Sequence, residues 1–90
     1  MIDHISVGVS DIARSAVFYE AVFAPLGMAK LVERPATVGF GKTYPEFWIN
    51  LRPGMPRVAA GSGVHMCFRA RTTEDVAAFY DAALKAGGAD

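Results

Sequence analysis

The feature that most constrains this chain is an internal repeat. His4 and His65 lie 61 positions apart, and the same displacement brings Phe18 onto Phe79 and Tyr19 onto Tyr80. Each copy opens with a strand-like segment containing the histidine, continues into a helix-like segment with the order Phe-Tyr-acid-Ala, and then reaches a glycine. A fixed period of this kind predicts a fold assembled from related units.

The first copy contains the signals of a strand, a helix and three further strands. Residues 2–9 alternate apolar and polar, which predicts a half-buried strand with His4 on the face opposite Ile5. Ser10 is the expected N-cap of a helix that runs to about Phe23, with Asp11 in its first turn. Pro25 and Gly27 are expected to end that helix. Later strands are expected over 28–34, 37–42 and 46–52.

The second copy begins after a segment rich in Gly and Pro and stops early. Residues 53–63 read as a linker, residues 64–70 as a strand and residues 73–85 as a helix. Thr72 is its expected N-cap, and the residues Val76, Phe79, Tyr80, Ala83 and Leu84 form its expected apolar face. The prediction is therefore an α+β domain with a first βαβββ module over 1–52 and the βα start of a second over 64–90. We expect the 90 residues to be the N-terminal part of a longer chain.

Composition limits the class of partner. Nine basic and nine acidic residues give no net charge, and no basic run is present, so nucleic acid and anionic membranes are not expected as partners. No apolar run approaches the ~20 residues of a membrane span, and no secretory signal is visible. The single cysteine, Cys67, favours a reducing compartment. We expect a cytoplasmic protein and, because an unfinished module exposes strand edges, a homodimer.

These motifs resemble the vicinal oxygen chelate superfamily of glyoxalases, bleomycin-resistance proteins and extradiol dioxygenases. The resemblance rests on Asp-His-Ile-Ser-Val-Gly-Val-Ser-Asp at the N-terminus, Ser-Ala-Val-Phe-Tyr-Glu in the first helix, Leu-Gly-Met after it, and the second Val-His-Met-Cys-Phe before Val-Ala-Ala-Phe-Tyr-Asp. It implies paired βαβββ modules whose sheets curl into a cup. It also implies a divalent metal in the cup, bound by residues on the first and last strands of each module, and a small oxygen-rich substrate.

Carried onto this chain, the resemblance places His4 and His65 at the two first-strand metal positions. Imidazole suits Zn, Ni, Fe, Co or Mn. A carboxylate is expected on the strand at 46–52, but alignment by eye places Asn50 at that position, and a neutral amide is a weak ligand for such ions. Glu46 has the right group near the start of the strand, so Asn50 and Glu46 both remain candidates for a third ligand.

Three further residues are candidates for substrate binding. Trp48 would stack on a planar ligand, Arg69 would hold an anion, and Cys67 lies beside His65. Two hypotheses follow. The first is a metal-dependent lyase or isomerase of glyoxalase I type, or an extradiol dioxygenase. The second is a protein that sequesters a small molecule without metal or catalysis, as bleomycin-resistance proteins do. The sequence specifies neither the substrate, nor the metal, nor the catalytic residues.

Overall fold

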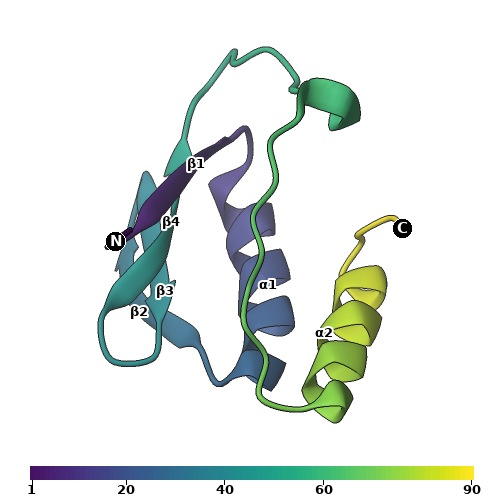
Figure 1. The fold of residues 1–90 in the computed structure, drawn as a ribbon. Helices are drawn as coiled ribbons and strands as arrows, with labels where there is room; N and C mark the ends of the chain where they lie inside the picture. The colour runs from purple at the N-terminus through teal and green to yellow at the C-terminus, as the bar shows by residue number, and fades with distance from the viewer.

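The computed structural model describes all residues from 1 to 90 and contains one four-stranded sheet with a helix against it (Figure 1). Its main elements are β1 (Ile5–Val9), α1 (Ile12–Phe23), β2 (Ala29–Arg34), β3 (Thr37–Gly41), β4 (Pro45–Leu51) and α2 (Thr73–Lys85). Short 3-10 turns, η1 and η2, span Ala24–Leu26 and Ala60–Ser62. The sheet order is β1-β4-β3-β2, with β1 parallel to β4 and the other pairs antiparallel. This is one βαβββ module followed by a helix, so the predicted α+β class is confirmed.

Helix α1 begins one residue later than the sequence indicated. The N-cap is Asp11, whose carboxylate accepts a 3.0 Å hydrogen bond from the Arg14 backbone N–H, so the expectation of Ser10 as the cap was wrong. Both residue types cap helices well, and the extended backbone of Asp11 aims its carboxylate at the third helical amide. Gly27, at a φ of 76°, turns the chain out of η1 and toward β2.

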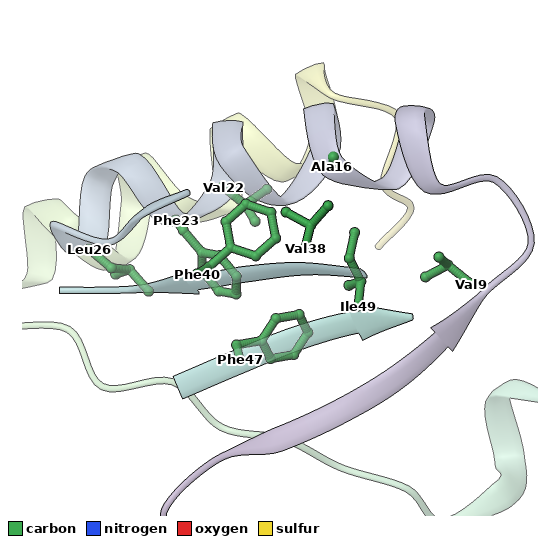
Figure 2. Packing of buried hydrophobic residues seen from close by; sticks show 9 residues of the cluster. All are labelled: Val9, Ala16, Val22, Phe23, Leu26, Val38, Phe40, Phe47 and Ile49. Carbon is green, nitrogen blue, oxygen red and sulfur yellow. The ribbon is translucent and has the colours of Figure 1, made fainter. Parts of the chain in front are cut away.

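The core lies between α1 and the sheet (Figure 2). Its centre is Phe23, which is fully buried and has its ring centroid 5.5 Å from that of Phe40 and 5.1 Å from that of Phe47. Such ring pairs add ~0.5–1.5 kcal/mol to the burial of their area. The buried residues are Val9, Ala16, Val22, Phe23, Leu26, Val38, Phe40, Phe47 and Ile49. They all come from the first 49 residues, so the module has its own core.

Residues 64–70 do not form the predicted strand. They run past α1 with no neighbouring strand (Figure 1), and residues 64–71 take part in no backbone–backbone hydrogen bond. The alternating pattern is nevertheless used, because Phe68 and Ala70 pack against the core while Cys67 and Arg69 are exposed. The pattern identifies two of the side chains that face inward, but Met66 is exposed. A strand also requires a hydrogen-bonded partner, and no strand of this chain pairs with the segment.

Helix α2 packs against α1 and η1, with its predicted cap in place. The Thr72 hydroxyl accepts a 3.1 Å hydrogen bond from the Asp75 backbone N–H. The predicted apolar face is correct only in part. Phe79 and Ala83 pack toward the core, as does Ala82. Three other members, Val76, Tyr80 and Leu84, are exposed by 57%, 45% and 41%.

Candidate functional site

The parallel pairing of β1 with β4 places the beginnings of these two strands side by side. Ile5 lies opposite Phe47 in the ladder. The residues that precede this pair, His4 and Glu46, therefore lie at the same end of the sheet. The histidine predicted as a ligand and a carboxylate thus precede the same pair of residues in the ladder.

A hollow of about 590 Å³ opens at this end of the sheet, and we call it the polar hollow. Its wall is formed by the starts of β1 and β4 on one side and by residues 65–69 on the other. Apolar side chains contribute part of the lining, and the charged and titratable groups contribute the rest. The lining residues are Ile2, Asp3, His4, Ile5, Met28, Lys42, Glu46, Phe47, His65, Met66, Cys67, Phe68 and Arg69. The two histidines related by the sequence repeat thus line a single site.

Asp3 orients the first of these histidines. Its carboxylate Oδ2 lies 2.8 Å from Nδ1 of His4. When Nδ1 carries the proton it donates to Asp3, and the lone pair is then on Nε2, the far nitrogen of the ring. Histidines that bind metals are commonly oriented by a carboxylate in this way. The pair is exposed, with 53% of the His4 side chain accessible, so solvent reaches the ring.

Phe68 fixes the position of the opposite wall. Its ring centroid lies 5.1 Å from that of Phe23 and 5.5 Å from that of Phe47, so the segment is anchored in the core by this side chain. Cys67 and Arg69 flank Phe68 in the sequence, are exposed, and line the polar hollow together with His65. Three of the residues selected from the sequence, His65, Cys67 and Arg69, are therefore brought together by one hydrophobic anchor.

Asn50 and Trp48 are not among the lining residues of the polar hollow. Asn50 lies opposite Gly8, further along the ladder, and its side-chain oxygen accepts a 2.9 Å hydrogen bond from the Thr37 hydroxyl. Trp48 is half-buried and lies so close over Gly39 that a Cβ at Gly39 would be 2.9 Å from its ring. Of the two candidates for a third ligand, only Glu46 lines the hollow that both histidines line.

Two charged residues of the polar hollow were not selected from the sequence. One is Asp3, and a carboxylate adjacent to a histidine in the sequence is a recognisable signal for an oriented imidazole. Lys42 follows the end of β3, where nothing in the local pattern points to a site. Neither Lys42 nor Arg69 forms an ion pair within the chain, whose salt bridges involve only His4 and Lys30 as cations.

The donors of the polar hollow do not by themselves fit a metal ion with three protein ligands. No group of three or more His, Cys, Asp or Glu side chains lies close enough together to hold an ion. The two histidines share the hollow, and Glu46 lines it as well, but the three do not converge on one point. No catalytic step through a metal follows from this arrangement.

A smaller hollow of about 280 Å³ adjoins the polar hollow, and we call it the apolar hollow. It lies between residues 65–70, η1 and the start of α2. Seven of its eight lining residues are hydrophobic: Leu26, Met66, Cys67, Phe68, Ala70, Val76 and Phe79, with His65 as the eighth. Residues 65–68 line both hollows, so one short stretch of chain has a polar site and an apolar site along it.

The βαβββ module places the chain in the class of small α+β domains. Within that class the chain belongs to the Glyoxalase/Bleomycin resistance protein/Dioxygenase superfamily, whose sequence profile matches residues 1–90. The resemblance inferred from the repeated His strand and Phe-Tyr helix is thereby confirmed.

A solved structure supports the same assignment. The crystal structure of a glyoxalase/bleomycin resistance protein from Albidiferax ferrireducens T118 is similar to this chain, with a TM-score of 0.79 and 27% sequence identity. The similarity covers 93% of this chain and 68% of that one. A comparison with curated proteins finds no match. Neither helix has the length and hydropathy needed to cross a membrane.

Proposed function

We propose that this superfamily member binds a small oxygen-rich molecule in the polar hollow. The observation that carries the proposal is that His4 and His65, 61 residues apart in the sequence, both line one hollow of about 590 Å³. Ligand sites are typically concave, with an apolar lining and a few convergent polar groups. Ile5, Phe47 and Phe68 supply the apolar part, and the imidazoles and charged side chains supply the polar part.

The proposal is tested by thermal melting of the full chain with a panel of small hydroxy acids, keto acids and catechols. A ligand at 100 times its dissociation constant stabilises the folded state by about 2.7 kcal/mol and raises the melting temperature. His4→Ala and His65→Ala should each reduce the shift, whereas Arg57→Ala, an exposed residue outside the polar hollow, should not. A panel that produces no shift in the parent chain contradicts the proposal.

A divalent metal bound by His4 and His65 is the second candidate, and the Asp3–His4 hydrogen bond favours it. That contact leaves Nε2 of His4 available as a ligand. Glu46 lines the same hollow and is the carboxylate we propose as a third ligand, in place of Asn50. Elemental analysis of the chain purified from metal-replete medium tests this directly. Stoichiometric metal that is lost in His4→Ala and retained in Asn50→Ala supports it, and absence of metal favours binding without metal.

Catalysis depends on which candidate is correct. Glyoxalase-type isomerisation and extradiol cleavage, the two chemistries expected from the sequence, both require a metal and a carboxylate. If the metal analysis is negative, a sequestering protein of bleomycin-resistance type is the function we propose. The cytoplasmic location expected from the single thiol remains a prediction.

A homodimer is the assembly we propose. Tyr80 and Leu84 are exposed apolar side chains of α2, and residues 64–71 form no backbone–backbone hydrogen bond. Both features favour association with another chain, because unpaired edges and apolar patches are usually covered. Sedimentation equilibrium of the full chain tests the assembly. Replacement of Tyr80 and Leu84 by Ser should shift a dimer toward monomer, and a parent chain that is monomeric at all concentrations contradicts the proposal.

A further inference from the structure

The polar hollow holds two cationic side chains with no partner in the chain. Lys42 follows β3, and Arg69 comes from the opposite wall. Neither side chain is in an ion pair, while the acidic groups of the same hollow are Asp3, which is bonded to His4, and Glu46. An ammonium and a guanidinium that line one site are suited to an anionic oxygen group.

The position of Lys42 is set by the backbone that precedes it. A Cβ built on Gly41 would overlap the carbonyl oxygen of Tyr44, so the chain passes too close to itself at this point for any residue but glycine. The ladder between β3 and β4 also shifts register between Phe40 and Gly41. The tight closure places the residue after Gly41 at the rim of the polar hollow, even though the Lys42 side chain itself is exposed.

The apolar hollow gives the second part of the argument. It lies directly beside the polar hollow, with residues 65–68 in common, and nearly all of its lining is hydrophobic. A molecule that extends from one hollow to the other would have an anionic end near Arg69 and an apolar end near Val76 and Phe79.

From these two observations we infer that the ligand is an amphipathic organic acid. Its carboxylate or phosphate lies between Lys42 and Arg69, and its aromatic or branched aliphatic part occupies the apolar hollow. This inference rests on the proposed function and narrows its substrate class. Glu46 also lines the hollow, and repulsion between like charges is expected to keep the anionic group of the ligand away from this carboxylate.

The test compares matched ligands by isothermal titration of the full chain. The probes are phenylacetate, acetate, phenylacetamide and phenyl phosphate. Phenylacetate should bind roughly tenfold more tightly than either acetate or phenylacetamide, since each of these lacks one of the two recognised parts. The phosphate probe distinguishes the anion, because a doubly charged group that binds more tightly than the carboxylate identifies a phosphate ester as the preferred class.

Variants assign the effect to the named residues. Lys42→Gln and Arg69→Gln should each weaken phenylacetate binding about tenfold and leave phenylacetamide binding unchanged. Arg57→Gln, exposed and outside both hollows, is the matched control. Val76→Thr changes the apolar hollow with almost no change of shape and should weaken binding of phenylacetate but not of acetate. Val17→Thr, on the exposed side of α1, is its control.

The outcomes separate the inference from the function on which it rests. If neutral oxygen-rich molecules bind as tightly as phenylacetate, or if Lys42→Gln and Arg69→Gln bind it like the parent, the amphipathic acid is excluded and the polar hollow remains a binding site. If no probe of any charge binds, and the broader panel gives no melting shift, both are overturned. Circular dichroism of each variant verifies that a loss of binding does not come from unfolding.

Discussion

The hydroxyl of Thr37 donates a 2.9 Å hydrogen bond to the side-chain oxygen of Asn50, across the β3–β4 ladder in which the two residues are direct partners. The contact is partly buried and engages the oxygen that Asn50 would offer to a metal. Asn50 therefore has a structural partner within the sheet, and Glu46 has none. This difference favours Glu46 as the carboxylate of the site.

Replacement of Thr37 by Val should destabilise the fold by about 0.5–1.5 kcal/mol, the usual net value of such a hydrogen bond. The shape of the side chain is retained, so the loss measures the hydrogen bond. Urea unfolding followed by circular dichroism gives the free energy. Thr43→Val, in the exposed turn between β3 and β4, is the control and should change stability by less than about 0.5 kcal/mol. Equal values for the two variants would show that the Thr37–Asn50 contact contributes nothing.

Replacement of Gly41 by Ala should lower the free energy of unfolding by about 1–3 kcal/mol or more, where 1–3 kcal/mol is the usual range for overpacking. The added methyl group would overlap the Tyr44 carbonyl oxygen, and this backbone atom cannot move aside as a flexible side chain does. Gly61→Ala is a matched control, because no heavy atom lies within 4 Å of the position its Cβ would take. Thermal melting of both variants checks the prediction, which is wrong if Gly41→Ala melts with the parent.

Alanine substitutions at Asp11 and Ser10 distinguish the observed N-cap of α1, Asp11, from the cap expected from the sequence, Ser10. Asp11→Ala should cost about 1 kcal/mol, because the Arg14 amide loses its acceptor. Ser10→Ala should change the free energy of unfolding by less than about 0.5 kcal/mol, since Ser10 is exposed and does not cap the helix. Denaturant titration of the two variants under the same conditions decides between them. A larger effect at Ser10 would reverse the assignment.

Tyr19 should make the fold sensitive to alkaline pH. Burial of its phenol against the core raises its pKa above the ordinary value of 10.0. The unfolded chain then releases this proton at a lower pH than the folded chain does. The stability supplied by the neutral phenol is therefore complete below about pH 10 and is lost as pH rises from there through the higher folded-state pKa.

Urea unfolding at pH 9 and pH 11 measures this loss. Tyr19→Phe should reduce the difference in stability between the two pH values, because the variant has no phenol to ionise. Tyr80→Phe, at a position with 45% exposure, should leave the difference unchanged. A Tyr19→Phe variant with the same alkaline loss as the parent would assign that loss to other groups.

The elements predicted from local pattern agree well with the structure, and the exceptions involve contacts between distant segments. Alternation located β1 and β4, and the Thr72 cap located the start of α2. The segment 64–70 has the same alternation as β1, but a ladder needs a neighbour, and local sequence does not show whether one is present. The exposed part of α2 was misassigned for the same reason: its apolar residues identify an apolar face, not what covers it.

Some of the residues that line the candidate site could be chosen from the sequence. The repeat selected His4 and His65, and both line the polar hollow; whether they bind a metal remains a prediction. Glu46 could be chosen over Asn50 only from the strand register, which pairs Ile5 with Phe47. Lys42 could not be selected, because its place at the hollow depends on the close approach of Gly41 and Tyr44 rather than on a motif.

The unpaired segment 64–71 makes the two walls of the polar hollow mechanically unequal. The wall from β1 and β4 belongs to a hydrogen-bonded sheet, whereas the other wall is held mainly by the side chain of Phe68. Amides without ladder partners exchange with solvent at low cost in free energy. Deuterium uptake should therefore be rapid over 64–71 and slow over β4, and a ligand that touches both walls should slow uptake in the segment first. Ligand binding is therefore expected to order the segment 64–71 against a sheet that is already rigid.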